Sequence, residues 1–216
     1  FPSMTAKRFM YLVYQVCYTN NMTQPHAKII ALVGLAGSGK SSAVEYFTKK
    51  GIPKIYFGGI IYKAMEEAGI EPTWDNQQKF REDIRRREGK DFVVKRVVKS
   101  AHDLIDAGQK LIVLDGLYTW SEYKILKHEF PGQMSVIAVV TPKHLRYQRM
   151  AKRPERPMQP REVDQRDWSE IENLEKGGPI AIADYFVMND RGLDELYAQL
   201  EAITHHEHFC KAPEQC

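Results

Sequence analysis

The sequence predicts an α/β protein with three layers, in which helices cover both faces of a parallel sheet of about five strands. Short continuous apolar runs alternate along the chain with longer segments whose apolar residues recur at helical spacing. This alternation is typical of parallel sheets, because the chain must cross back over the sheet between parallel strands. The 216 residues, 43% of them hydrophobic, are enough for one such domain with a buried core.

Five apolar runs are the predicted strands. Their apolar residues are continuous rather than alternating with polar ones, as expected of strands that are buried on both faces. In chain order the runs are Ile29–Val33, Ile55–Phe57, Leu111–Leu114, Val136–Val140 and Tyr185–Met188. We expect Gly58 and Gly59 to close the second strand.

Helices are predicted between the strands, where apolar residues lie three or four positions apart. The first helix begins at Lys40 and ends before Gly51, a residue type that readily adopts the left-handed conformation of a helix C-cap. Further helices are expected over 61–68, 74–87, 93–105, 143–153, 162–176 and 193–203.

The segment between the first strand and the first helix carries the motif that decides the class of protein. It reads Gly-Leu-Ala-Gly-Ser-Gly-Lys-Ser and matches the phosphate-binding P-loop at every fixed position. The glycines let the backbone wrap around phosphates, and the backbone N–H groups bind them. Lys40 is expected to reach the phosphates of ATP, and Ser41 to ligate Mg²⁺. The predicted nucleotide-binding residues here are Gly34, Ala36, Gly37, Ser38, Gly39, Lys40, Ser41 and Ser42.

An acidic residue ends the third predicted strand. Asp115 should therefore lie at the edge of the sheet where the carboxyl ends of the strands meet and where ligands bind in open α/β sheets. We assign it a catalytic role at the Mg²⁺ ion or at the phosphoryl acceptor. The alternative is an acid that caps the next turn or helix.

Arginines gather after the fourth predicted strand. Arg146, Arg149 and Arg153 share one helix face, a proline-rich loop follows, and Arg166 lies on the next helix. A basic helix–loop–helix suits a closing lid, which brings guanidinium groups to the transferred phosphoryl group and excludes water. We assign Arg149 and Arg153 as catalytic contacts. The alternative is a charged surface that binds nothing.

These three features together resemble the nucleoside monophosphate kinase-like group of P-loop kinases. Within that group the chain is similar to dephospho-CoA kinases and to adenylate-kinase-related proteins of archaea. The resemblance runs from about Lys28 to Ile203, and it also rests on Thr141–Arg149 and Ile182–Gly192. It implies five parallel core strands, an acceptor-binding helical region after the second strand, and an arginine lid.

The resemblance also implies roles for further residues. It places the adenine base near the loop after the last strand, so Asn189 and Arg191 are assigned to the nucleotide. It implies basic residues that face a phosphate in the acceptor region, and Arg81 and Arg85 are assigned there, with Lys95 as a further candidate. A charged helix that only faces solvent is an equal alternative for these residues.

One departure from the family pattern concerns the acceptor. Dephospho-CoA kinases and most of the archaeal relatives carry an Asp directly after the second strand, whereas this chain has Gly58 and Gly59. A hydroxyl acceptor benefits from such a base, but a phosphate acceptor is already ionised. The missing Asp therefore argues against a plain dephospho-CoA kinase, unless Asp115, Glu66 or Glu67 takes its place.

We expect the chain to consist of a leader over 1–25, a P-loop kinase domain over 26–204 and a tail over 205–216. Within the domain, 58–100 is the expected acceptor-binding region and 143–178 the expected arginine-rich lid.

The expected function is that of an ATP- and Mg²⁺-dependent kinase that acts on a nucleotide or nucleotide-like acceptor of the monophosphate or dephospho-CoA type. The leading alternative is a nucleotide-binding regulatory ATPase, or switch, with no small-molecule acceptor. A third is a kinase of RNA or DNA ends, against which the net charge of only +3 argues. The chain lacks a guanine-reading Asn-Lys-x-Asp motif and is short for a typical AAA+ module.

Composition also sets expectations for location and assembly. The three cysteines lie near the termini without the spacing of zinc or redox motifs, which favours a reducing, cytoplasmic location. The apolar run near the N-terminus is too short to span a bilayer, so no membrane partner is expected. We expect a monomer or a small homo-oligomer.

Overall fold

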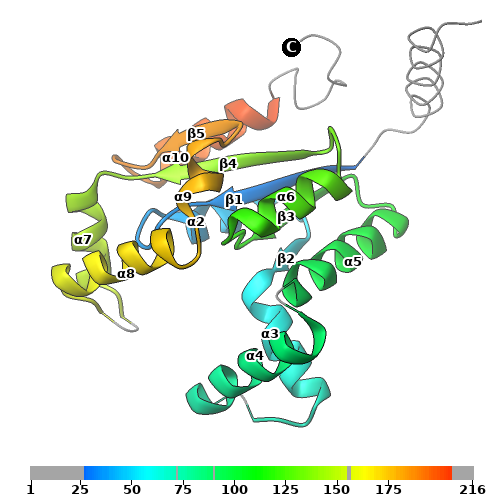
Figure 1. Cartoon of the computed structure of the whole chain (residues 1–216). Helices are drawn as coiled ribbons and strands as arrows, with labels where there is room; N and C mark the ends of the chain where they lie inside the picture. Colours follow the sequence, from blue (N-terminus) through cyan, green and yellow to red (C-terminus); the bar gives the residue numbers. More distant parts are fainter. Residues whose placement is uncertain (1–26, 72, 90, 155–156, 206–216) are drawn as a thin grey trace, which may run out of the picture.

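The predicted strands form a single five-stranded parallel sheet in the computed structural model, which describes residues 27–71, 73–89, 91–154 and 157–205 (Figure 1). The order across the sheet is β2-β3-β1-β4-β5. The bounds are Lys28–Val33 for β1, Lys54–Tyr56 for β2, Leu111–Asp115 for β3, Met134–Val140 for β4 and Tyr185–Met188 for β5. The leader and nearly all of the tail lie outside the described residues.

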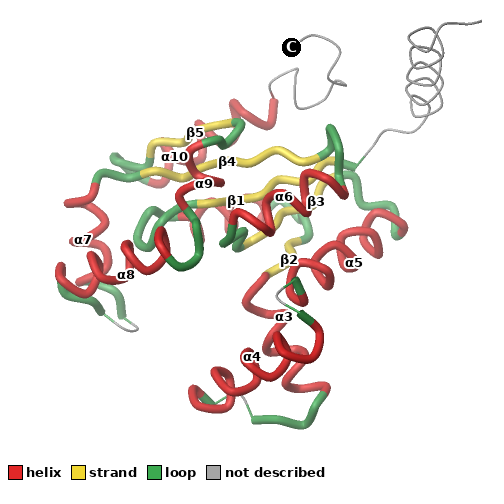
Figure 2. Tube along the Cα trace, in the orientation of Figure 1, coloured by secondary structure: helices red, strands yellow, loops and turns green. Residues whose placement is uncertain are grey.

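Helices cover both faces of the sheet, which confirms the three-layer α/β/α class (Figure 2). Helices α2 and α10 pack on one face, and α5 and α6 pack on the other. In chain order the helices are α2 (Lys40–Lys49), α3 (Phe57–Glu67), α4 (Trp74–Glu88), α5 (Phe92–Asp106), α6 (Trp120–Glu129), α7 (Lys143–Ala151), α8 (Pro160–Glu172), α9 (Gly177–Ala181) and α10 (Leu193–His205). Within the described residues, no helix is long and apolar enough to cross a membrane.

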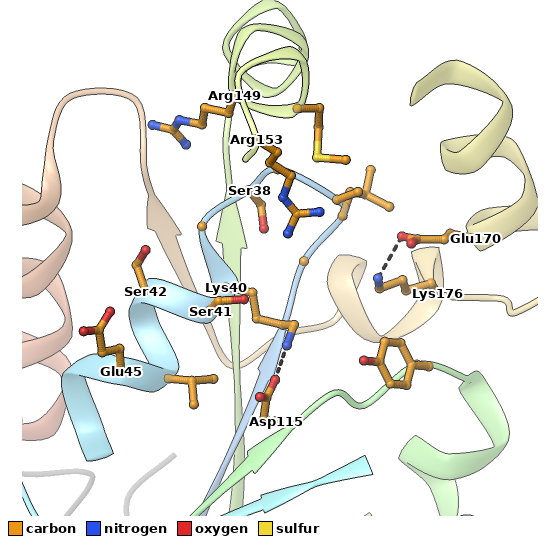
Figure 3. A pocket seen from close by; sticks show the side chains of 18 of the residues that line it. Ser38, Lys40, Ser41, Ser42, Glu45, Asp115, Arg149, Arg153, Glu170 and Lys176 are labelled. Atoms are coloured by element: carbon orange, nitrogen blue, oxygen red, sulfur yellow. Dashed lines mark hydrogen bonds and ion pairs between the residues drawn. The ribbon is translucent and has the colours of Figure 1, made fainter. Parts of the chain in front are cut away.

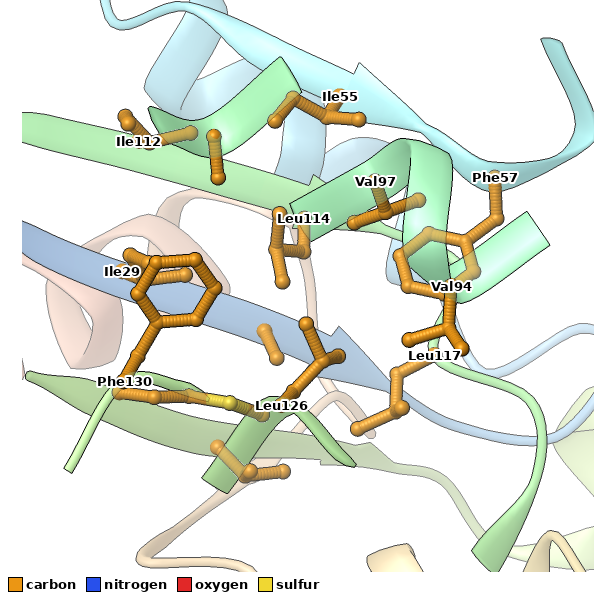
Figure 4. Packing of buried hydrophobic residues seen from close by; sticks show 14 of the residues in the cluster. Ile29, Ile55, Phe57, Val94, Val97, Ile112, Leu114, Leu117, Leu126 and Phe130 are labelled. Atoms are coloured by element: carbon orange, nitrogen blue, oxygen red, sulfur yellow. The ribbon is translucent and has the colours of Figure 1, made fainter. Parts of the chain in front are cut away.

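The central strand explains why the strand sequences are continuously apolar. Ile29, Ala31 and Val33 belong to the core cluster under α5 and α6, whereas Ile30 and Leu32 belong to the cluster under α2 and α10. All five are fully buried, because successive side chains of a strand point to opposite faces and both faces are covered. Figure 4 shows the cluster that contains Ile29. The two clusters hold the sheet rigid beneath the loops at its carboxyl edge.

The register of the sheet brings residues from three strands to one edge. Leu32 of β1 pairs with Asp115 of β3, and Tyr56 of β2 pairs with the same Asp115. Because the strands are parallel, the P-loop that follows β1 lies beside the ends of β2 and β3. This edge holds the candidate site.

The second strand ends differently from the prediction. Gly58 and Gly59 do not close it as a loop, because they lie in the first turn of α3, which begins at Phe57. Phe57 is buried in the core cluster and fixes this start. A Cβ atom at Gly58 would lie 2.5 Å from the ring of Tyr56, so glycine leaves room for the ring to fold over the helix start.

Helices α3, α4 and α5 correspond to the expected acceptor region over 58–100. They share a small core cluster of their own, formed by Ile61, Ala64, Met65, Phe80, Ile84 and Phe92. The pair α3–α4 projects away from the sheet beyond β2 (Figure 1). The structure therefore contains the helical region, and its acceptor-binding role stays a proposal.

Two helices, α6 and α9, were not predicted from the periodicity of apolar residues. Helix α6 begins at a capping box, in which Thr119 Oγ1 accepts from the N–H of Glu122 at 3.0 Å and Glu122 Oε2 accepts from the N–H of Thr119 at 2.9 Å. The pattern Thr-x-x-Glu is a sequence signal for this start. Helix α9 has only five residues, too few for a periodic pattern.

Candidate active site

A cleft of about 680 Å³ lies at the carboxyl edge of the sheet (Figure 3). Its walls come from the P-loop and α2, from the ends of β2 and β3, and from α7, α8 and the turn before α9. The predicted residues that line it are Gly34, Ala36, Gly37, Ser38, Gly39, Lys40, Ser41, Ser42, Asp115, Arg149 and Arg153. Residues from three separate predictions, the P-loop, Asp115 and the lid arginines, therefore meet in one space.

The P-loop has the backbone of a phosphate cradle. Gly37 and Gly39 have φ values of 78° and 94°, a left-handed region that glycine adopts without strain. Gly39 must also lack a side chain, because Asn189 packs directly against it. The hydroxyl of Ser38 is buried and, among the described residues, has no hydrogen-bond partner. An orphaned buried hydroxyl inside such a cradle fits a site that is completed by phosphate oxygens.

Lys40 and Asp115 form an ion pair at the centre of the cleft. Lys40 comes from the first turn of α2 and Asp115 from the end of β3, and their side chains are only 16% and 13% exposed. The side chain of Ser41 lies beside that of Lys40, on the P-loop side of the cleft (Figure 3). Ser41 and Asp115 thus offer the hydroxyl and carboxylate oxygens that Mg²⁺ prefers in P-loop proteins.

A smaller cavity of about 230 Å³ lies on the other side of the P-loop. It is lined by Gly39, Ser42, Arg149, Asn189, Gly192 and Leu193. It lies beside the loop after β5, and the binding of the adenine base there stays a prediction. The side chain of Asn189 itself donates to Ser38 O at 2.8 Å, so it holds the P-loop backbone in place.

The arginines of the lid region have separate roles. Arg149 lines both cavities and donates to Asn189 O at 2.9 Å, whereas Arg153 lines the cleft and is exposed. Arg146 is buried and makes two hydrogen bonds to Asp167, at 2.9 and 2.6 Å. It also donates to Ala36 O at 3.1 Å. Arg146 therefore joins α7 and α8 to the P-loop, although it shares a predicted helix face with the other two.

Among the other predicted residues, Arg191 lies away from the cleft. Arg191 has a side chain that is 75% exposed and 3.9 Å from Glu195, and it lines neither cavity. Arg81 and Arg85 lie on α4, but their side chains are outside the described part of the chain. No described residue of α4 lines the cleft.

The suggested substitutes for the missing Asp also differ in position. Glu66 is exposed on α3, and Glu67 pairs with Arg96 at 2.9 Å. Neither lines the cleft, whereas Asp115 does. Trp120, at the start of α6, stacks on Tyr123 with ring centroids 5.1 Å apart.

Several residues of the cleft were missed from the sequence: Lys54, Tyr56, Tyr118, Glu170 and Lys176. Lys176 Nζ donates to Glu170 Oε2 at 2.8 Å, and both residues are buried. Burial lowers the pKa of Lys176, and Glu170 offsets this only in part. Burial raises the pKa of the Tyr118 hydroxyl. No sequence signal marks these residues, since a Glu and a Lys six positions apart are typical of an exposed surface.

Comparisons with known proteins show the family of the chain. A family model described as the AAA domain matches residues 30–176. A UPF0200 protein of Thermococcus onnurineus is 31% identical over 179 residues, which cover 82% of this chain and 96% of that protein. The chain belongs to the UPF0200 family and carries an AAA domain. The family model bears the AAA name even though the chain is short for a typical AAA+ module.

Solved structures of small kinases share the fold. A shikimate kinase of Bacteroides thetaiotaomicron has a TM-score of 0.52 at 11% identity, covering 82% of this chain and 97% of that one. A dephospho-CoA kinase of Campylobacter jejuni has a TM-score of 0.50 at 18% identity, covering 83% and 98%. At such low identity the likeness shows the fold alone, which is that of P-loop kinases. The UPF0200 name states no activity.

Proposed function

We propose that this protein is an ATP-dependent phosphotransferase that moves the γ-phosphoryl group of MgATP to a small nucleotide-like acceptor. The observation that carries the proposal is the meeting of Lys40, Asp115, Arg149 and Arg153 around one P-loop cleft. Phosphoryl transfer needs little covalent chemistry from the protein, and it proceeds by positioning and charge stabilisation. This constellation of residues supplies both.

The donor side follows from the P-loop and the smaller cavity. Backbone N–H groups of the P-loop and the Lys40 ammonium would hold the phosphates, and the space beside Gly192 and Leu193 would take the adenine. Ser41 and Asp115 would hold Mg²⁺, which when bound neutralises charge on the phosphates. In this structure the Asp115 carboxylate forms an ion pair with the Lys40 ammonium group.

The lid side contributes the guanidinium groups of Arg149 and Arg153. Arg153 is exposed at the mouth of the cleft, and Arg149 is held against Asn189 at its inner end. Arginine donors are suited to phosphoryl oxygens because the guanidinium group is always charged and forms paired hydrogen bonds. Closure of α7 and α8 over the cleft would bring Arg153 to the transferred group and exclude water.

The acceptor side favours a substrate that is already ionised. Gly58 and Gly59 offer no carboxylate, and the ring of Tyr56 covers them. Asp115 is engaged with Lys40, and Glu170 with Lys176. No base stands free among these residues to take a proton from a hydroxyl, so a nucleoside monophosphate fits better than dephospho-CoA.

Acceptor-dependent release of ADP tests the proposal. The purified protein is incubated with ATP and Mg²⁺, alone and with AMP, CMP, UMP, the deoxynucleoside monophosphates or dephospho-CoA. We expect one acceptor to raise the rate well above the basal rate. Lys40→Ala should lower the stimulated rate on the order of a hundredfold or more.

The control is a variant outside the cleft, Lys127→Met, which should keep the stimulated rate. Slow hydrolysis that no acceptor changes would contradict the kinase proposal for this panel. It would favour the regulatory ATPase, in which a partner protein reads the nucleotide state.

A further inference from the structure

A second lysine–carboxylate pair lines the cleft on the side formed by α8 and α9. Lys176 lies in the turn between these helices and pairs with Glu170, and their side chains are only 4% and 11% exposed. Lys40 and Asp115 form the corresponding pair on the P-loop side (Figure 3). The cleft thus contains two enclosed lysines, each beside one carboxylate.

The backbone around Lys176 is built to place this lysine. Glu175 has a φ of 53°, the one positive value among the described non-glycine residues, and such a conformation costs energy in a side-chain-bearing residue. The turn closes as the N–H of Lys176 donates to Glu170 O at 3.1 Å. Lys176 Nζ also lies 5.2 Å from the ring centre of Tyr118. The backbone turn, the Glu170 carboxylate and the Tyr118 ring together fix the position of the ammonium group.

The stability of the fold gives a weak reason for this burial. Taking a lysine and a carboxylate out of water costs about as much as their attraction returns, so a buried ion pair rarely adds much stability. The binding of an anion in a positively charged cleft gives a stronger reason for the burial of Lys176. Six basic and three acidic side chains line it, and the Lys40 charge helps to lower the pKa of Lys176. Such a concentration of positive charge attracts anions.

We propose that Lys176 binds an oxyanion of the phosphoryl acceptor, a phosphate or carboxylate group, which replaces Glu170 as its partner. This inference rests on the proposed kinase function and narrows the acceptor to anions. Lys176 then holds the anionic group of the acceptor, as Lys40 holds the phosphates of the donor. Arg166, which donates to Glu170 at 3.0 Å, keeps that carboxylate paired when Lys176 turns to the ligand.

The test separates the acceptor subsite from the P-loop. The donor site is first saturated with the Mg²⁺ complex of a non-hydrolysable ATP analogue, whose binding is measured separately. Inorganic phosphate and, in a parallel series, acetate are then titrated, and binding is followed by NMR shifts of backbone amides around Lys176. We expect both anions to bind, and the tighter one identifies the preferred group. Lys176→Met should weaken binding about tenfold or more, whereas Lys176→Arg should retain most of it.

The chain offers a control lysine in a similar but more exposed ion pair. Lys127 also pairs with a carboxylate, Asp184 at 3.2 Å, and lies 5.9 Å from the ring centre of Tyr123, but it is outside the cleft. Lys127→Met should leave anion binding unchanged. Glu170→Gln should tighten it, since no carboxylate then competes for Lys176, and this variant carries the test if Lys176→Met does not fold.

Two results would overturn the proposal. One is equal anion binding by Lys176→Met and the unmodified protein, or no change in Glu170→Gln. The other is no anion binding by the analogue-loaded protein. If the analogue itself fails to bind, the proposed kinase function fails first, and this inference falls with it.

Discussion

The buried pair of Arg146 and Asp167 is the point where the lid helices meet the P-loop. Both side chains are less than a tenth exposed, and Arg146 also reaches Ala36 O. Removing one member leaves the other charge buried without a partner. Arg146→Met should therefore lower the free energy of unfolding by about 3–5 kcal/mol, measured by urea denaturation.

Arg153→Met is the comparison for that experiment, because Arg153 is exposed. Its effect on the free energy of unfolding should stay within about 0.5 kcal/mol. Equal small effects of the two substitutions would contradict the structural role of Arg146.

Glu170 provides a second prediction for a single residue. Burial alone would raise its pKa, but Lys176 and Arg166 together outweigh burial, and the pKa is lowered. Its charge therefore contributes stability above the unfolded-state pKa, and this is lost as the pH falls through the lowered value. In Lys176→Met the pKa of Glu170 should rise, which a ¹³C NMR titration of its carboxyl carbon measures. An unchanged pKa would show that Lys176 does not hold this charge.

Residues that act through a local pattern could be found from the sequence, and residues that act through a distant contact could not. The P-loop is eight consecutive residues in a fixed order, so its chemistry can be read directly. The burial of Lys176 depends on Tyr118 and on a backbone turn at Glu175, which no spacing reveals. Arg146 differs from Arg149 only because Asp167 lies opposite it.

The junction of β2 and α3 is where an element departs from its prediction. Two glycines in a row indicate a loop, yet tertiary packing of Phe57 starts the helix there. Alanine at Gly58 should add helix stability of up to about 1 kcal/mol, but its Cβ atom meets the Tyr56 ring. In a Tyr56→Ala background, Gly58→Ala should stabilise the protein by that amount. In the unmodified protein the gain should be smaller or reversed.

A double-mutant cycle of melting temperatures measures this coupling. Equal effects of Gly58→Ala in the two backgrounds would mean that the Tyr56 ring does not occupy the space beside Gly58.

The proposed lid is an element whose helices could be predicted from the sequence, whereas its closure stays a proposal. Periodicity and arginine spacing indicated α7 and α8, and the proline-rich loop indicated the break between them. If the lid closes on nucleotide, the backbone amides of α8 should exchange with deuterium several-fold more slowly when the MgATP analogue is bound. Amides of α5, which contributes no residue to the cleft, provide the internal control. Equal slowing of α5 and α8 would indicate general stabilisation instead of lid closure.

At the scale of the whole molecule, the parallel sheet brings residues that are far apart in the sequence close together in space. The order β2-β3-β1-β4-β5 brings Tyr56, Asp115 and the P-loop to one edge, although Tyr56 and Asp115 are far apart in the chain. Five parallel strands and their order of appearance could be predicted because buried strands have continuous apolar sequences. The positions of α3 and α4 beyond the sheet could not be predicted, because the sequence of an amphipathic helix does not indicate which neighbour it packs against.

The central claim is that the γ-phosphoryl group leaves ATP for an acceptor and not for water. ³¹P NMR of a reaction with ATP, Mg²⁺ and each acceptor in turn observes this directly. The proposed function predicts that, with one anionic acceptor, ATP is consumed, a new phosphoryl resonance grows in step, and little inorganic phosphate forms. ADP and inorganic phosphate in equal amounts, whatever the acceptor, would contradict it.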